Sequence, residues 1–221
     1  IKFVEHLLKP KTGRLVSVGD DEQSIFSFAG GDIDAFDYLM SRPNTTQLPL
    51  PTTYRCGSRI VDEARKYSKK IVSRKNAHKG IVRNGFFHEV EEGDMVIARN
   101  NAPLVDAYFR LVEDNKKAKI YGKDIEKGLV SLAEKCMAKQ KDTFTDRLYE
   151  ELDKVVDELV RKGVRNPDKH LKYGNLSDKI ELLEIIVNKV NSTAEIVPLL
   201  KTMFVDNEAP GVKLMTAHDI L

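Results

Sequence analysis

Three features that this sequence lacks narrow what the protein can be. No apolar run approaches the roughly 18 residues that a membrane-spanning helix needs, so nothing predicts a membrane protein. Cysteine is scarce: Cys56 and Cys136 are far apart and in no metal-type spacing, which predicts no metal site and suits a reducing, cytoplasmic compartment. The phosphate-cradling pattern G-x-x-x-x-G-K-S/T occurs nowhere, so these 221 residues contain no Walker-type loop.

Charge is nearly balanced overall but unevenly distributed. The formal net charge of +2 is too small to predict a nucleic-acid partner on its own. Between residues 63 and 83, however, a basic block faces a single acid, Glu63. Its members are Arg65, Lys66, Lys69, Lys70, Arg74, Lys75, Lys79 and Arg83. A solvated helix face explains such a block without any partner, and a nucleic-acid surface is the alternative.

Residues 18–31 read VGDDEQSIFSFAGG and follow a β-branched run, Arg14–Val18, which predicts a buried parallel strand. Ligands bind at the carboxyl ends of strands in open α/β sheets. Asp20 and Gln23 are therefore candidates for contacts with a nucleotide phosphate and its metal. An ordinary strand-to-turn junction would show the same local pattern.

Aromatic side chains beside polar groups occur at two places. Phe26 and Phe28, spaced by two in an extended segment, can point the same way and stack on unpaired bases, although two core phenylalanines would have the same spacing. Residues 51–57 read PTTYRCG. There Tyr54 can stack on a purine, and Arg55 presents a planar fork of donors that suits a phosphate.

An α/β pattern follows in the middle of the chain. Asp94–Arg99 and Ala118–Tyr121 are predicted to be strands on either side of a helix over Pro103–Glu113. Strand, helix and strand with short links predict a parallel sheet. Residues 212–218, VKLMTAH, are predicted to begin with a further strand.

Other helices are predicted from apolar periodicity and capping residues. One includes Ile33 and ends before Pro43, and another starts near Ser58 with an inner face that extends to Ile71. After Gly122 the pattern is helical throughout. The predicted helices there cover Ile125–Met137, a segment capped by Thr145, a segment that opens at Ser177 after a loop at Tyr173-Gly174, and a segment with a capping box of Ser192 and Glu195.

Three of these strings resemble signature motifs of superfamily 1 DNA helicases of the UvrD, Rep and PcrA type. Residues 18–31 resemble the third motif, residues 51–57 the fourth, and residues 212–218 the start of the fifth. The sequence departs from the family patterns at Ala29, Thr53 and Cys56-Gly57, and the Lys-Gly-Leu-Glu expected soon after His218 is absent.

The resemblance implies a role for each matching residue. Gln23 and Arg55 would be catalytic, the first sensing the terminal phosphate of ATP and the second acting as an arginine finger. Tyr54 would stack on adenine, and Asp20 would lie near the nucleotide and Mg²⁺. The implied DNA-binding residues are Phe26, Phe28, Arg99, Thr216 and His218. For Arg99, in a string that resembles a strand of the second motor domain, an ordinary surface arginine is the alternative.

The implied fold is α/β, with an incomplete RecA-like parallel sheet of the P-loop NTPase type and an all-helical insertion. Residues 1–46 would end the first motor domain and residues 47–122 begin the second. Residues 123–205 would form the helical insertion, and residues 206–221 would return to the second domain. Because the chain opens on Ile1 within an amphipathic helical pattern, we expect it to belong to a longer protein.

The function implied for that protein is an ATP-dependent helicase and translocase of 3′-to-5′ polarity. It would couple ATP hydrolysis, with Mg²⁺, to movement on single-stranded DNA and unwinding of duplex DNA, alongside repair or replication proteins. These residues alone are expected to hydrolyse no ATP. A second interpretation is a nucleic-acid-binding or docking module of a recombination or repair complex that does not hydrolyse ATP.

Overall fold

The computed structural model describes residues 2–9, 12–20, 22, 34–205 and 209–217. Internal contacts divide the chain into two compact units, residues 1–85 and residues 86–221, called below the N-terminal unit and the C-terminal unit. The predicted four-part organisation into motor domains and an insertion stays a prediction.

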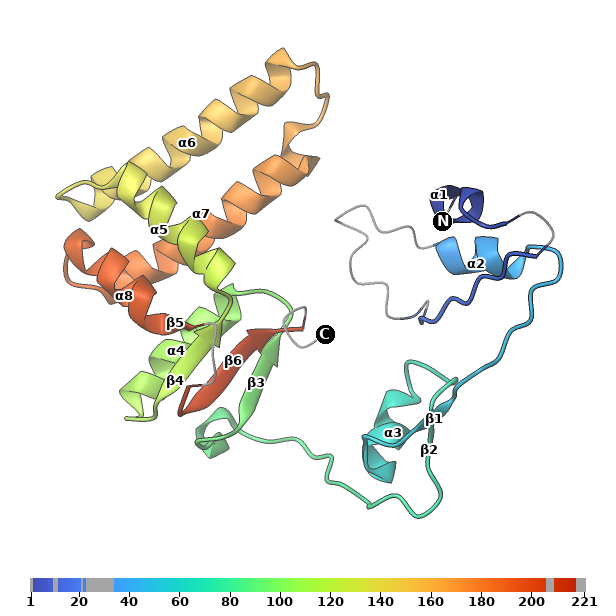
Figure 1. Ribbon diagram of the computed structural model, residues 1–221. Coiled ribbons are helices and arrows are strands. Elements are labelled where there is room, and N and C mark those ends of the chain that lie inside the picture. Colours follow the sequence, from blue (N-terminus) through green and yellow to red (C-terminus); the bar gives the residue numbers. More distant parts are fainter. Residues whose placement is uncertain (1, 10–11, 21, 23–33, 206–208, 218–221) are drawn as a thin grey trace. The chain divides into compact units, whose positions relative to one another are not determined.

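The N-terminal unit contains short helices and a parallel strand pair (Figure 1). Its described elements are α1 (Lys2–His6), α2 (Ala35–Met40), β1 (Thr52–Thr53), α3 (Ser58–Ala64) and β2 (Val72–Ser73). β1 and β2 pair in parallel with Thr53 opposite Ser73, so α3 is the crossover that connects them. Glu5 joins α1 to α2, because its carboxylate accepts from the Tyr38 hydroxyl at 2.8 Å and pairs with Arg42 Nε at 2.9 Å.

The segment Arg14–Val18 is not a strand, so the sequence-based prediction was wrong there. It has no ladder partner among the described residues, and Val16 and Val18 are 86% and 83% exposed. A β-branched run becomes a strand only when a neighbouring strand supplies hydrogen bonds and another layer covers its side chains. The amino-acid sequence of Arg14–Val18 does not show whether either condition is met.

Helix α3 starts at Ser58 as predicted but is shorter than expected. It ends at Ala64, although its inner face was predicted to extend to Ile71, and Tyr67 within that range is 89% exposed. β2 has to begin beside β1, where the Val72 N–H donates to the Pro51 carbonyl at 2.9 Å. The chain therefore leaves the helical path after two turns and returns to the strand pair.

The described part of the C-terminal unit is built on a four-stranded parallel sheet (Figure 1). Its strands are β3 (Met95–Ala98), β4 (Ala118–Tyr121), β5 (Phe204–Val205) and β6 (Val212–Thr216), in the order β3-β6-β4-β5. The predicted α/β class, the three predicted strands and their parallel pairing are confirmed. β6 comes last in the sequence but lies between β3 and β4, so the two strands of the predicted β-α-β unit are not neighbours.

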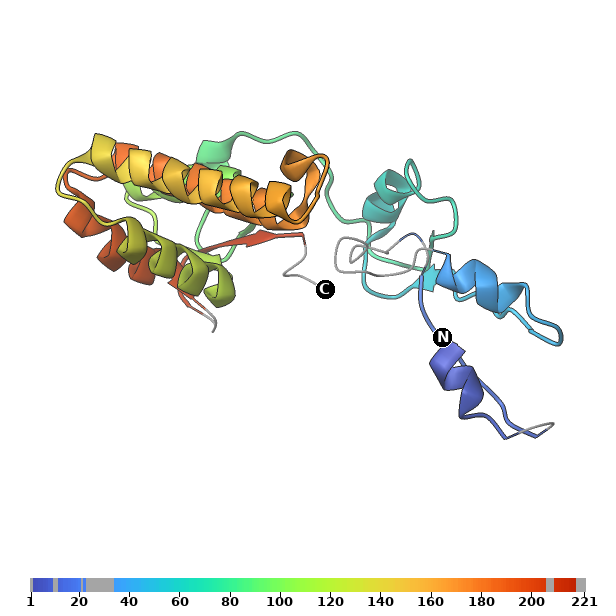
Figure 2. The ribbon, with the colours of Figure 1, turned by 90° about the horizontal axis from the view of Figure 1, so that it is seen from above.

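Five α-helices belong to the described part of this unit. They are α4 (Ala102–Glu113), α5 (Lys123–Cys136), α6 (Lys141–Arg161), α7 (Leu171–Lys189) and α8 (Ile196–Met203). Of these, α4, α5 and α8 pack on the sheet. α4 packs across β3, β6 and β4, whereas α5 and α8 lie together near β5 (Figure 2). The long helices α6 and α7 run side by side, and α7 also packs on α4. Leu104, Ile120 and Leu183 are buried in the same apolar cluster, so helices and strands share one core.

Helix α6 starts one turn earlier than the capping pattern predicted. Thr145, the expected cap, lies inside the helix, and the observed N-cap is Gln140. The Gln140 carbonyl accepts from the Phe144 N–H at 3.0 Å. Because Phe144 is fully buried, packing of its ring accounts for the extra turn.

Helix α7 also starts earlier, at Leu171. The predicted loop at Tyr173-Gly174 and the predicted start at Ser177 both lie within it. The His170 imidazole Nδ1 accepts from the Lys172 N–H at 3.1 Å and provides the cap that was expected from a serine. A single helical glycine costs only about 1 kcal/mol, so the buried face of α7 outweighs it.

The capping box of Ser192 and Glu195 that was predicted before α8 does not form. Glu195 Oε2 accepts from the Asn191 N–H at 3.1 Å, and Glu195 Oε1 accepts from the Ser192 hydroxyl at 3.3 Å. The Ser192 side chain caps no backbone N–H among the described residues. A short 3₁₀ helix, Thr193–Glu195, therefore precedes α8.

Glu158 links the end of α6 to the start of α7 and gives a pH-dependent prediction. It accepts from Lys162 Nζ at 2.6 Å and from Lys172 Nζ, and these hydrogen bonds lower its pKa from the usual 4.5 to about 2. A carboxyl with a depressed folded-state pKa stabilises the fold above the unfolded-state pKa and loses this effect as pH falls toward the folded-state value. Glu158→Gln should lower the melting temperature at pH 7, and the deficit should shrink between pH 4.5 and pH 2.

Circular dichroism melts at several pH values measure this deficit. Glu150→Gln removes an exposed charge on the same helix without these lysine partners and is the matched control. A deficit that is constant with pH, or equal in both variants, would contradict the prediction.

Candidate functional site

Tyr54 and Arg55 lie in the connection between β1 and α3. β1 ends at Thr53, and the Thr53 hydroxyl accepts from the Arg55 N–H at 3.3 Å, which turns the chain out of the strand. Both side chains are exposed, Tyr54 to 76%. The two residues predicted to bind a nucleotide thus stand at the carboxyl end of a parallel strand, where such ligands usually bind.

The first N–H groups of α3 are not available to an anion at this edge. The Ser58 N–H donates to the His78 carbonyl and the Arg59 N–H to the Lys79 carbonyl, each at 2.8 Å. Gly57 permits this contact, since a Cβ there would lie 2.9 Å from the Lys79 oxygen. A phosphate at this edge would therefore be bound by side chains and not by the first N–H groups of α3. Arg55 is the basic side chain in the connection between β1 and α3.

Asp20 lies in a turn of its own. Its Oδ1 accepts from the Glu22 N–H at 3.0 Å, and the preceding Gly19 lies so close to α2 that a Cβ would come within 2.6 Å of the Phe36 ring. The residues predicted to act beside Asp20 lie outside the described residues. They are Gln23, Phe26 and Phe28.

In the C-terminal unit, Arg99 and Thr216 are brought together although more than a hundred residues separate them. β3 and β6 pair with Ala98 opposite Thr216, and the Ala217 N–H donates to the Ala98 carbonyl at 3.0 Å. Both residues thus lie at the carboxyl edge of the sheet. Arg99 is exposed, whereas Thr216 is buried; His218 lies outside the described residues.

Asn101 is a polar residue at the same edge that sequence reasoning did not single out. It is the N-cap of α4, yet its side chain caps no backbone N–H, and its buried Oδ1 has no hydrogen-bond partner among the described residues. An unpaired buried acceptor costs about 1–3 kcal/mol. The signal in the sequence was an asparagine two residues after Arg99.

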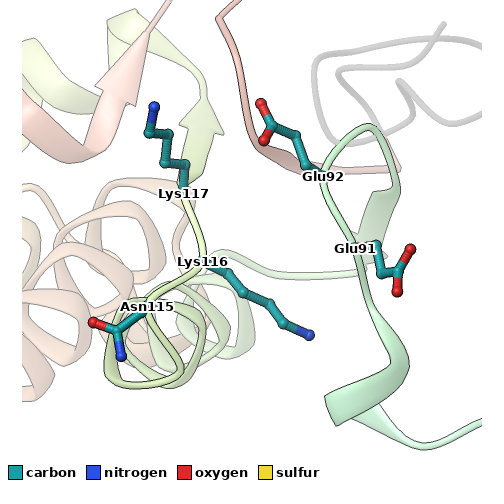
Figure 3. A pocket seen from close by; sticks show the side chains of 5 residues that line it. All are labelled: Glu91, Glu92, Asn115, Lys116 and Lys117. Atoms are coloured by element: carbon teal, nitrogen blue, oxygen red, sulfur yellow. The ribbon is translucent and has the colours of Figure 1, made fainter.

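A hollow of about 420 Å³ lies at the opposite edge of the sheet (Figure 3). Glu91, Glu92, Asn115, Lys116 and Lys117 line it, in loops that precede β3 and β4. Lys116 Nζ donates to the carbonyls of residues 88 and 90, at 2.8 and 2.6 Å. These hydrogen bonds connect the loop before β4 to the segment before β3. Because ligands of parallel sheets bind at carboxyl ends, this hollow is not the candidate site.

The described residues also do not assemble a metal centre. No group of three His, Cys, Asp or Glu side chains in this part of the chain is placed to hold an ion. The oxygen ligands that Mg²⁺ prefers are therefore not gathered there. A search of the same residues found no helix with the length and apolarity needed to cross a membrane.

The described residues thus contain two candidate sites, each at the carboxyl edge of a parallel strand pair or sheet within its own unit. The first carries Tyr54 and Arg55, and the second carries Arg99, Asn101 and Thr216. Comparisons with protein-family models, with curated proteins and with solved structures returned no match.

Proposed function

We propose that this chain is part of an ATP-dependent DNA translocase and helicase of superfamily 1, with RecA-like motor domains. One observation carries the proposal: Arg99 and Thr216, more than a hundred residues apart in sequence, lie at the carboxyl ends of neighbouring parallel strands. Arg99 and Thr216 are the residues for which the motif resemblance implied a common DNA partner. Their shared edge supports that assignment.

On the nucleotide side, Tyr54 stacks on adenine and Arg55 neutralises charge on the transferring phosphoryl group. The exposure of both side chains at a strand end supports these roles. Gln23 senses the terminal phosphate in this proposal, and Asp20 is its described neighbour in the third motif. Mg²⁺ would accompany the nucleotide in this proposal, although no group of three His, Cys, Asp or Glu side chains among the described residues is placed to hold it.

On the DNA side, Arg99 is exposed and contacts a backbone phosphate. Phe26, Phe28 and His218 are the further DNA contacts of the proposal. Stacking on Phe28 gives a grip that tolerates any base, because every base has a π-face. Cycles of ATP binding and release then move the gripped strand, which is translocation.

Titration of single-stranded DNA at several salt concentrations tests the proposal. Each neutralised phosphate contributes about 0.7 to the slope of log affinity against log salt for single strands. Arg99→Gln in the 221-residue chain should weaken binding of an oligothymidylate and lower this slope by about 0.7.

Arg161→Gln, at the exposed end of α6, removes the same charge away from the sheet edge and should leave the slope unchanged. Equal slopes for the chain and both variants would mean that Arg99 is an ordinary surface arginine. Absence of DNA binding by the unaltered chain would contradict the DNA half of the proposal.

A further inference from the structure

The basic residues of the N-terminal unit are not spread evenly around α3. Between Thr52 and Arg83 the chain has ten Lys and Arg residues against two acids, Asp62 and Glu63. Because β1 and β2 are parallel, the start of α3 and the residues after β2 lie at the carboxyl edge, and the residues after α3 lie at the amino edge. The two groups differ in how their charges are balanced.

At the amino edge, two of the four basic residues are paired with acids. Lys66 Nζ is 2.7 Å from Glu63 Oε2, and Lys70 Nζ is 3.5 Å from Glu22 Oε1. At the carboxyl edge, by contrast, no basic side chain makes an ion pair with a carboxylate of the described residues, and all are exposed. These carboxyl-edge residues are Arg55, Arg59, Arg74, Lys75 and Lys79.

Backbone hydrogen bonds hold the three segments that carry these side chains together. The Arg74 N–H donates to the Thr53 carbonyl at 3.2 Å, so Arg74 follows β2 beside the point where Arg55 follows β1. The turn after Arg74 contains Asn76 at φ 63°, and the chain then reaches the start of α3 at residues 78 and 79. There the Arg59 N–H donates to Lys79, as described above.

We infer that Arg74 and Lys75, with Lys79, form a phosphate-binding arm that extends the Arg55 site and takes the phosphate tail of a nucleoside triphosphate. The inference rests on the proposed function for the nucleotide. It adds residues to which the motif resemblance gave no role. Several unpaired cations on one rigid edge repel one another, and a compact polyanion that accepts charge-assisted hydrogen bonds from all of them removes this repulsion.

A nucleotide tail fits this edge better than a nucleic-acid strand does. The cations are gathered at the ends of two short strands, whereas a strand of nucleic acid is usually tracked by a groove several nucleotides long. The exposed ring of Tyr54 is at the same edge and offers one stacking face, which suits one base.

Calorimetric titration of the 221-residue chain with inorganic tripolyphosphate is the deciding experiment, since this probe has neither base nor sugar. R74Q/K75Q should weaken tripolyphosphate binding by about tenfold or more. R65Q/K69Q is the matched control, because it removes the same charge from exposed, unpaired residues at the amino edge, and it should change binding by no more than about twofold. K75Q alone should give an intermediate loss.

Four results would overturn the inference: no tripolyphosphate binding by the chain, equal losses in both double variants, no loss in R74Q/K75Q, or a loss confined to an oligothymidylate probe. Competition with ATP separates the inference from the proposed function. If tripolyphosphate binding depends on Arg74 and Lys75 but ATP does not displace it, the phosphate site stands and the nucleotide function fails. If ATP binds equally well to both double variants, the inference fails and the proposed function stands.

Discussion

Replacing Arg55 by alanine is expected to lower kcat for ATP hydrolysis by about 10³–10⁵-fold in the protein that carries this chain. The Arg55 side chain is exposed at the carboxyl end of β1, and the N–H groups at the start of α3 are already bonded to residues 78 and 79. The first two N–H groups of α3 are therefore not free to replace the guanidinium. Because an arginine finger acts mainly on the transition state, the dissociation constant of ATP should change far less than kcat.

Steady-state phosphate release and equilibrium binding of a slowly hydrolysed ATP analogue measure the two quantities. Arg65→Ala, which removes an exposed arginine at the other end of α3, is the matched control and should leave both unchanged. A kcat within tenfold of the parent value would contradict the role of Arg55. An intact protein that binds DNA but never hydrolyses ATP would favour the non-hydrolysing binding module instead.

Replacing Gly211 by alanine is expected to destabilise the C-terminal unit by about 3 kcal/mol. Gly211 has φ +114°, and a Cβ there would overlap the Lys117 carbonyl, whose carbon would be only 2.7 Å away. The same carbonyl accepts from the Val212 N–H at 2.8 Å, which starts the β4–β6 ladder. The Gly211 carbonyl also accepts from the Gly93 N–H at 3.3 Å, so the clash disturbs the loops before three strands.

Alanine substitutions at two other glycines measure the cost of backbone strain separately from the cost of the steric clash. Gly163 has φ +79° but open space around a Cβ, so Gly163→Ala should cost only about 1–2 kcal/mol. Gly174 lies within α7, also with open space, and Gly174→Ala should stabilise the unit by about 0.5–1 kcal/mol. Urea unfolding followed by circular dichroism ranks the three variants. Equal costs for the changes at 211 and 163 would show that the clash is relieved by a small backbone shift.

Prediction from the sequence was most accurate where the apolar pattern was long and the elements that pack together are close in sequence. The strand at 94–99, the helix at 103–113 and the strand at 118–121 were all found, since apolar spacing over a short β-α-β segment leaves few alternatives. The position of β6 between β3 and β4 was not predicted. It depends on a strand that follows β4 only after four α-helices and the short β5, and no local pattern encodes that pairing.

Capping patterns were less reliable, because burial competes with them. Thr145 and Ser177 have the right chemistry for a cap, but both lie inside longer helices. In each case the helix begins earlier, where Phe144 or the His170 imidazole provides packing or a hydrogen bond. The Arg14–Val18 strand failed for the converse reason, since its pattern was right and its partner was missing among the described residues.

The candidate functional residues, like the fold, were predicted only in part from the sequence. Residue types identified Tyr54 and Arg55 as candidates, since base stacking and phosphate recognition each need particular side chains, and the motif resemblance added Arg99 and Thr216. Only the folded chain decided that Arg99 and Thr216 share one strand edge, that Asn101 leaves an acceptor unpaired there, and that Arg74 stands beside the Arg55 turn. The physical reason is that strand pairing joins residues distant in sequence through backbone hydrogen bonds, whose partners no side-chain pattern specifies.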